Sequence, residues 1–178
     1  MNETLNHDAP PEHGTKLLRG PLWWRLLKKF ILVGLITGAV LFGLSMFSSS
    51  PTNLGVNNGQ LAPCPDTPNC VSSFSTKETQ MMDPIKFWSG NGDDTLAVIK
   101  QTVLENFEDV KTTSESEDYI HFEFTSSFFR FVDDVEFLLD EESELVHFRS
   151  ASRVGRSDLG VNRSRMKKIT ELLAPPEN

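Results

Sequence analysis

The stretch YIHFEFTSSFFRFVDDVEFLLDEESELVHFRSASR, residues 119–153, alternates apolar and polar side chains with the period of two that is typical of β-strands. It predicts a run of three strands, at 119–125, 129–139 and 145–153. A further strand is expected just upstream, at 110–114. Because consecutive strands joined by short connections pair side by side, the sequence predicts an antiparallel sheet.

The apolar positions of the last two strands also predict how these strands pair. If both apolar faces point the same way, Leu139 pairs with Glu144 across a four-residue loop. On the polar face this register predicts three cross-strand pairs: Glu136 with His147, Asp134 with Arg149, and Arg130 with Arg153. On the apolar face it places Asp133 opposite Ser150, and a polar pair inside an aromatic core favours a role other than packing.

Amphipathic helices are predicted on either side of these strands. The first is expected to begin at 93–95, where acidic and hydroxyl side chains favour a helix start, and to end at 106–108. The second is expected to begin with Asn162 as its N-cap residue and to end before Pro175. Their apolar stripes consist of Leu96, Ile99, Val103 and Phe107, and of Met166, Ile169 and Leu173. The predicted fold class is α+β: an antiparallel β-sheet with about two helices packed on one face, preceded by a single transmembrane helix.

The transmembrane prediction rests on residues 30–47, an apolar segment without a charged side chain. As a helix this segment rises about 27 Å, close to the roughly 30 Å hydrocarbon core of a bilayer. Interfacial and basic residues precede it, namely Trp23, Trp24, Arg25, Lys28 and Lys29. No Lys or Arg follows until Lys77, so the positive-inside rule predicts a cytoplasmic N-terminus and an exported C-terminal part.

Three other interpretations of this segment fit its surroundings less well. A cleaved signal peptide would have a shorter apolar run and an A-x-A-like site, and here Pro51 follows the segment closely. A lipoprotein signal is suggested by LAPC at 61–64, but Cys64 lies far beyond the apolar run and Pro63 stands where Gly or Ala is needed. A buried core helix would have polar positions along one face, and this segment has none.

The chain is therefore predicted to consist of a disordered cytoplasmic tail (1–29), the transmembrane helix (30–47), a linker (48–60) and an exported domain (61–178). The expected location of the domain is the periplasmic side of a bacterial inner membrane. Residues 51–178 hold twelve Lys and Arg against twenty-two Asp and Glu, and this acidic balance argues against nucleic acid as a partner.

Both cysteines of the chain, Cys64 and Cys70, fall on the exported side, where disulfides persist. Pro65 and Pro68 restrict the loop between them, which favours a structural disulfide. Free thiols remain an alternative, as does metal or redox chemistry. A zinc site would need further His or Cys ligands, and a redox pair is more often C-x-x-C.

The most basic part of the chain is FRSASRVGRSDLGVNRSR, residues 148–165, which holds five arginines and one acid. Together with CPDTPNCVSS at 64–73 and FVDDVEF at 131–137, it resembles the family catalogued as domain of unknown function 1499. The resemblance covers about residues 61–173, with the three motifs in the expected order. It implies an envelope-associated protein without an established activity.

This arginine-rich stretch predicts a strand–turn–helix segment that binds an anion, because guanidinium groups bind carboxylate or phosphate with two parallel hydrogen bonds. Backbone N–H groups at the start of the helix would add further donors. The candidate ligand-binding residues are Arg153, Arg156, Arg163, Arg165 and Asn162, supported by Asp133, Asp134, Arg149 and Asp158. The alternative is that the arginines pair internally with nearby carboxylates, namely Asp133, Asp134, Glu136 and Asp158.

The favoured function is a binding module for an anionic small molecule, a lipid headgroup or a partner carboxylate. One alternative is an enzyme acting on an anionic substrate, with Asp133, Asp158 or His147 in acid–base roles, and another is a structural envelope scaffold. The sequence has no recognisable nucleophile–base signature or phosphate-binding glycine loop, and no cofactor or metal is expected. His121 and His147 fall on the polar strand face, where solvation or pairing with Glu136 is expected.

Two structural outcomes separate these functions. A pocket that joins Arg153, Arg156 and Asp133 would favour the enzyme, and a fully ion-paired set of arginines would favour the scaffold.

Overall fold

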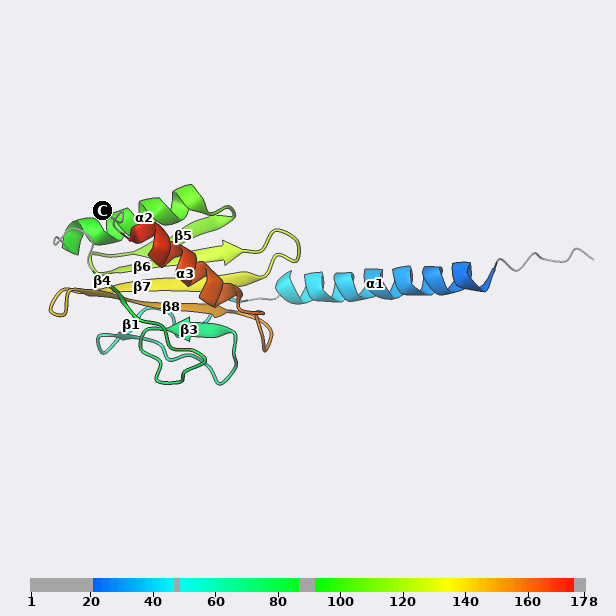
Figure 1. The fold of residues 1–178 in the computed structure, drawn as a ribbon, viewed down its shortest axis with the longest axis horizontal. Helices are drawn as coiled ribbons and strands as arrows, with labels where there is room; N and C mark the ends of the chain where they lie inside the picture. The colour runs from blue at the N-terminus through cyan, green and yellow to red at the C-terminus, as the bar shows by residue number, and fades with distance from the viewer. Residues whose placement is uncertain (1–20, 47–48, 87–91, 175–178) are drawn as a thin grey trace, which may run out of the picture. The chain divides into compact units, whose positions relative to one another are not determined.

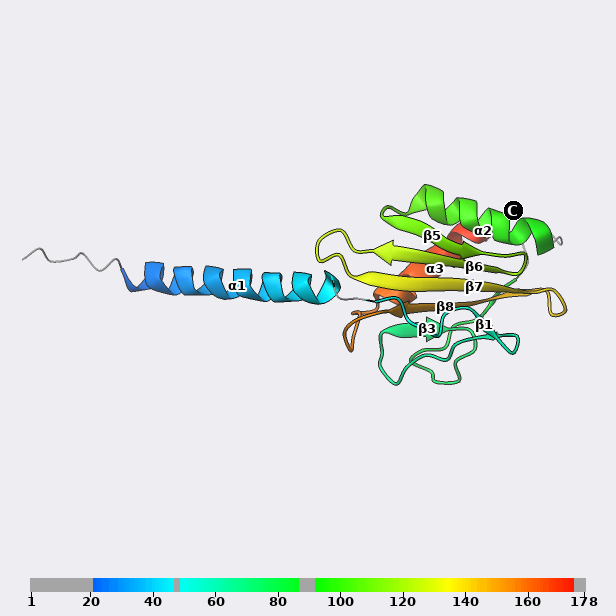
Figure 2. The ribbon, with the colours of Figure 1, turned by 180° about the vertical axis from the view of Figure 1, so that it is seen from behind.

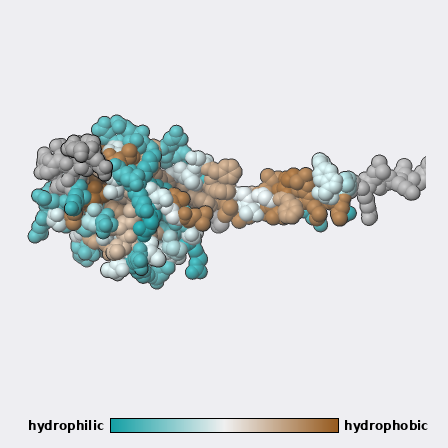
Figure 3. Space-filling model, viewed as in Figure 1, coloured by the Kyte–Doolittle hydropathy of each residue, from teal (hydrophilic) through white to brown (hydrophobic). Residues whose placement is uncertain are grey.

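The computed structural model of the chain describes residues 21–46, 49–86 and 92–174, which form an N-terminal helix and a separate α+β domain (Figure 1). The helix, α1, covers Leu22–Met46 and begins upstream of the apolar segment, so it includes the two tryptophans and the basic residues that precede that segment. Leu22–Gly43 is long and apolar enough to cross a membrane, although an N-terminal signal sequence has the same features. Most of the surface of α1 is apolar, as Figure 3 shows.

The domain is built on a six-stranded antiparallel sheet, which confirms the predicted fold class. The strands along the sheet are β3 (Cys70–Ser72), β8 (Leu145–Ser152), β7 (Val132–Asp140), β6 (Tyr119–Thr125) and β5 (Val110–Glu115). The short strand β4 (Ile85–Lys86) pairs with the first residues of β8. The predicted bounds of the strands differ from these mainly at β7, which begins at Val132 because the preceding aromatic residues belong to a loop.

Two helices, α2 (Gly92–Asn106) and α3 (Val161–Leu173), pack on one face of the sheet (Figures 1 and 2). Their predicted apolar stripes meet the inward-facing side chains of β6, β7 and β8 in a single core. The fully buried side chains at its centre include Ile99, Val103, Phe122, Phe137, Phe148, Met166 and Ile169. Burial of one such side chain stabilises the fold by roughly 1.5–3 kcal/mol, so this core is the main source of stability.

The register of β7 and β8 differs from the predicted one by two residues. Asp140 pairs with Leu145, and the loop between them is closed by Glu144 in a left-handed conformation (φ 53°). Because side chains alternate with a period of two, this shift keeps the same residues in the core. It also places Glu136 opposite Arg149, which corrects the predicted pairing of Arg149 with Asp134.

The second face of the sheet is covered by the segment that precedes β3. Its hairpin, β1 (Val56–Asn57) with β2 (Gln60–Leu61), brings Leu61 against Tyr119 and Leu138. The backbone N–H of Gly55 donates a hydrogen bond of 2.7 Å to a carboxylate oxygen of Glu136. Nearly half of the predicted linker 48–60, from Gly55 onward, therefore belongs to the folded domain, and the outer face of the sheet is buried rather than solvated.

Candidate functional site

The adjacent aspartates of β7 lie on opposite faces of the sheet, as their neighbouring positions on a strand predict. Asp134 is buried beneath the covering segment, and Asp133 faces α3. Each binds an arginine of the basic stretch, so the candidate residues are divided between two separate networks.

The first network surrounds Asp134, of which the structure exposes only 1%. Arg153 donates to both of its carboxylate oxygens, from Nε at 2.9 Å and from Nη2 at 2.7 Å, and Nη2 also pairs with Glu123. His121 lies on the other side of Asp134, with Nε2 2.9 Å from Oδ1. A bulge in β5 turns Thr113 toward the same ring, so that its hydroxyl lies 2.9 Å from Nδ1. Both ring nitrogens of His121 are thus occupied, which corrects the expected solvation or pairing with Glu136.

The ionisation of this network follows from its hydrogen bonds. Burial by itself raises the pKa of Asp134, but the hydrogen bonds from Arg153 and His121 outweigh burial and lower this pKa below its ordinary value. The hydrogen bond to Asp134 is also the main cause that raises the pKa of Arg153 above its ordinary value. The Arg153–Asp134 contact is therefore a buried ion pair, and the Arg153 side chain, 6% exposed, is engaged by internal carboxylates instead of an external anion.

A second charged pair lies next to it on the same face. Glu136 is fully buried and accepts hydrogen bonds from Arg149 at 3.0 Å and from the Tyr119 hydroxyl at 2.8 Å, in addition to the Gly55 N–H. Burial and the neighbouring Glu136 carboxylate raise the pKa of Tyr119 above its ordinary value, so the phenol stays a donor. Arg149 is structural, as its supporting role predicts, but its partner is Glu136.

The start of α3 holds the third group of candidate residues. Asn162 is not the N-cap; Gly160 occupies that position with φ 83°, and the carboxylate of Asp158 accepts hydrogen bonds from the N–H groups of Gly160 and Asn162 at 3.0 and 2.7 Å. Burial raises the pKa of Asp158, but these backbone hydrogen bonds lower it overall. Asp158 therefore takes the capping role, because its position before the helix allows its oxygens to reach the free N–H groups.

The Asn162 side chain points into the domain and is fully buried. Its amide nitrogen donates to the Asn69 carbonyl at 3.1 Å, to the Ser152 hydroxyl at 2.9 Å and to Asp158 at 2.8 Å. Its amide oxygen accepts from the hydroxyl of Ser150 at 2.6 Å. These bonds tie the disulfide loop, β8 and α3 together, so Asn162 acts as an internal connector.

Arg165 completes this inner network. Its guanidinium group donates to Asp133 at 2.5 Å, to Ser150 at 3.2 Å and to Asn162 at 2.8 Å, and it stacks 4.6 Å from the ring centre of Phe124. Asp133 pairs across the sheet with Ser152 rather than with Ser150, yet Arg165 bridges it to Ser150. Asp133 and Ser150, which were expected to form a polar pair inside the core, are thus connected through Arg165, and this connection binds α3 to the sheet.

The remaining two arginines lie at the surface. Arg163 donates to the backbone carbonyls of Thr79 and Met81, at 2.9 and 3.2 Å. Arg156 is exposed, and within residues 21–46, 49–86 and 92–174 no side chain or carbonyl pairs with it. Of the five arginines, Arg156 is the one that has no partner in the part of the chain that the structure describes, which makes it the best candidate to contact an external anion.

The disulfide loop carries the first of the three motifs. Cys64 and Cys70 form a disulfide, in agreement with the prediction. Asn69 of this loop donates to the carbonyls of Ser152 and Gly155 at 3.3 and 2.9 Å. Together with Asn162 and Asp133 it joins the three motifs into one continuous structure.

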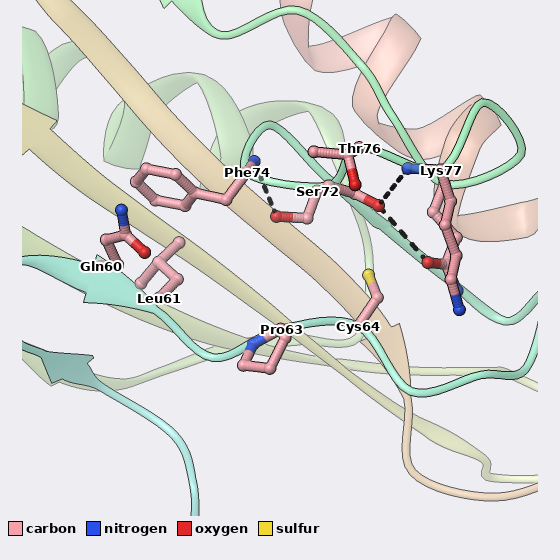
Figure 4. A pocket seen from close by; sticks show the side chains of 10 residues that line it. Gln60, Leu61, Pro63, Cys64, Ser72, Phe74, Thr76 and Lys77 are labelled. Atoms are coloured by element: carbon pink, nitrogen blue, oxygen red, sulfur yellow. Dashed lines mark hydrogen bonds between the residues drawn. The ribbon is translucent and has the colours of Figure 1, made fainter.

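Beside the disulfide lies an open pocket of about 340 Å³ (Figure 4). Most of its polar side chains already bond to their neighbours: the Ser72 hydroxyl accepts from the Phe74 N–H at 3.1 Å, and Lys77 pairs with Asp66. The lining therefore offers few unused donors, and this pocket has no convergent charge that would select a ligand.

A serine–histidine contact escapes sequence reasoning, because Ser73 lies in the turn after β3 and His147 lies on β8, far apart in the sequence. The Ser73 hydroxyl lies 3.1 Å from Nδ1 of His147, whose ring stacks on Phe74 and whose Nε2 is 3.9 Å from Asp140. Burial lowers the pKa of His147. The Ser73 hydroxyl, however, accepts a hydrogen bond of 2.9 Å from the N–H of Phe148 and so completes the β8 edge, and the Asp140 contact exceeds hydrogen-bond distance. The contact fits a structural role.

Acid–base and metal chemistry find little support in the described part of the chain. Arg153 and Asp133 lie on opposite faces, so the predicted enzyme pocket that would join them with Arg156 does not form. In residues 21–46, 49–86 and 92–174, no group of three or more His, Cys, Asp or Glu side chains is placed to hold a metal ion. The absence of a cofactor stays a prediction.

These features define an α+β domain in which an antiparallel sheet carries helices on one face and buried ion pairs on both faces. In the chain, this domain follows a candidate membrane helix. A family model described as a protein of unknown function (DUF1499) matches residues 60–173, and the chain belongs to this family. No curated protein and no solved structure matches the chain.

Proposed function

We propose that this chain is a single-pass membrane protein whose exported domain works as a binding module for an anionic partner. The observation that carries the proposal is the exposed guanidinium group of Arg156, which has no partner among the described residues and lies on the same loop as the exposed side chain of Leu159. A charge and apolar groups presented together to solvent are typical of a contact surface.

Membrane anchoring is supported by α1 and by the charge around it. Leu22–Gly43 rises about 33 Å as a helix, enough to span a bilayer. The Cys64–Cys70 disulfide supports export, since disulfides persist outside the reducing cytoplasm. A reporter that is active only outside the cytoplasm, fused after Asn178, should be active, and activity of a cytoplasm-only reporter at that position would contradict the topology.

Binding is preferred to catalysis because the polar groups that acid–base chemistry would use are engaged in structural bonds. Asp133, Asp134 and Asp158 each neutralise an arginine or cap a helix, and such carboxylates hold one protonation state instead of exchanging protons.

Native mass spectrometry of the purified full-length chain tests this proposal. Anionic molecules that co-purify with the chain should be lost from the Arg156→Ala variant and kept by Lys111→Ala, which removes an exposed cation from β5. Identical spectra for the parent chain and Arg156→Ala would contradict a binding role for Arg156.

The scaffold is the second candidate, and the internal pairing of Arg149, Arg153 and Arg165 favours it. A scaffold that assembles with other envelope proteins needs none of these arginines at its surface. Loss of function on changing Arg156, with unchanged stability, would support the binding module over the scaffold.

A further inference from the structure

The two ends of the sheet differ in chemistry. One end carries the β6–β7 loop (126–131) and the β8–α3 loop (153–160), which together are called the loop end below. Phe128 is 82% exposed and Leu159 95% exposed, and Val161 follows at 49%. Large apolar side chains so fully exposed on neighbouring loops mark an interaction surface.

Hydrogen bonds and a groove make the loop end one continuous surface. The N–H of Arg153 donates to the Val132 carbonyl at 3.1 Å, which joins the β8–α3 loop to the first residue of β7. An open groove of about 470 Å³ extends from Ser126 to Leu159 and Val161. Figures 1 and 2 show both loops at the same end of the sheet.

The loop end also presents two arginines that can meet an external anion. Arg156 is unpaired among the described residues, and Arg130 makes one exposed contact of 3.5 Å with Asp109. Exposed pairs of this kind contribute little, so Arg130 can exchange this partner for another anion. Acids on this side of the sheet include Asp109, Glu108 and Asp158, and the Asp158 carboxylate caps the N–H groups of α3.

The opposite end is strongly acidic. Residues 115–118 and 140–144 form its two turns and contain no Lys or Arg. They carry the carboxylates of Glu115, Glu117, Asp118, Asp140, Glu141, Glu142 and Glu144. Lys100 of α2 reaches Glu115 and neutralises one of these charges. An anionic surface would therefore repel this end far more strongly than the loop end, where Arg130 and Arg156 can face it.

The tether is long enough to bring the loop end to a membrane that α1 crosses. Residues 47–54 lie between the end of α1 and Gly55, which is bound to Glu136, and eight extended residues reach about 30 Å at most. Glu136 lies four residues from Val132 along β7, about 13 Å from the loop end. A connection of this maximum length keeps the loop end within reach of the bilayer.

We propose that the loop end docks on the surface of the bilayer that anchors the chain, with Phe128 and Leu159 in the interfacial layer and Arg130 and Arg156 against anionic phospholipid headgroups. This inference rests on the proposed membrane anchor. Apolar side chains that enter the interface beside cations bind anionic membranes through both burial and attraction. Docking would hold the acidic end away from the membrane, open to other partners.

Limited trypsin digestion tests the docking, because Arg130 and Arg156 are themselves cleavage sites in the loop end. The full-length chain is reconstituted into phosphatidylglycerol-rich vesicles, at fewer than one chain per vesicle, and compared with the chain in an uncharged detergent. Cleavage after both arginines should slow by about tenfold or more in the vesicles. Burial of one large apolar side chain in the interface lowers the fraction of undocked domains by about that factor, and only undocked domains are cleaved. Cleavage after Lys86, which lies beside Leu145 at the acidic end, should be unchanged.

A double variant, Phe128→Ser with Leu159→Ser, should restore rapid cleavage in vesicles. Both side chains are exposed, so the fold is kept. Leu172→Ser is the matched control: it removes a leucine 42% exposed near the far end of α3, about 16 Å along the helix from Val161, and should keep the protection.

The outcomes separate the docking from the anchor. A chain that carbonate washing removes from the vesicles would refute the anchor itself. A chain that stays in the vesicles but is cleaved as fast as in detergent would overturn the docking alone. Equal protection in purely phosphatidylcholine vesicles would overturn the role of Arg130 and Arg156, and protection that arises only at high chain density would assign the loop end to a second copy of the chain.

Discussion

Replacing Arg153 with alanine should strongly destabilise the domain, whereas replacing Arg156 should not. The Arg153 side chain is 6% exposed, and its loss leaves the buried carboxylate of Asp134 without its main partner. Removal of one member of a buried ion pair costs about 3–5 kcal/mol of folding free energy. For a domain of this size the melting temperature should fall by about 10–20 °C. Arg156→Ala should change stability by no more than about 0.5 kcal/mol, because its side chain is exposed.

Thermal and urea unfolding of residues 49–178, followed by circular dichroism, provide the measurement, since this fragment contains every residue of both apolar clusters. Adding Asp134→Asn to Arg153→Ala should recover part of the loss, because the unpaired charge is then removed from the interior. If Arg153→Ala melts within a few degrees of the parent, Arg153 does not hold Asp134 in a buried pair, and the anion-binding role for Arg153 returns.

Three further changes test the remaining structural inferences. Peptide mapping without reduction should recover Cys64 and Cys70 in one linked peptide, and the double serine variant should lose about 2 kcal/mol of unfolding free energy; two alkylated thiols in exported protein would contradict the bond. Gly160→Ala should cost about 1 kcal/mol although nothing lies within 4 Å of the new methyl group, because φ is 83°; an unchanged urea midpoint would contradict this cost. The pKa values of Asp134 and Asp158 are lower in the folded state than in the unfolded chain, where an aspartate has a pKa of about 3.9. These carboxylates therefore stabilise the fold fully at pH values above the unfolded-state pKa, and this stabilisation is lost as pH falls through their folded-state pKa values. The urea midpoint should therefore drop between about pH 5 and about pH 3, and Asp134→Asn should flatten that drop.

The sequence by itself determined the elements of the domain and the composition of its core. Periods of two and of 3.6 residues are local properties, so the inward positions of Phe122, Phe137 and Phe148, and the apolar faces of α2 and α3, follow from the pattern alone. The side chain of Asp133 was likewise assigned to the inner face, and its neighbour Asp134 to the outer one. Residues 64–73, 131–137 and 148–165 were identified as motifs, but their shared network was not.

Only the tertiary structure decided which carboxylate each arginine meets. A two-residue shift in the β7–β8 register leaves every core side chain in place, so the apolar pattern cannot distinguish the two registers. That shift moves Arg149 from Asp134 to Glu136 and frees Asp134 for Arg153. Partners such as Glu123 and Asn69 come from distant parts of the chain, and no local signal marks them.

The burial of the outer sheet face was also decided by tertiary contacts. A polar strand face beside a segment rich in Ser, Asn and Gly predicts solvent and a linker. The hairpin Val56–Leu61 nevertheless covers that face, because Leu61 has an apolar partner in Leu138 and the Gly55 N–H has a buried acceptor in Glu136. Charges that would be solvated on an open strand become ion pairs once that cover excludes water, and this long-range step makes Arg149 and Arg153 structural. Arg165 becomes structural on the other face, where it joins α3 to Asp133, and Arg156 stays at the surface.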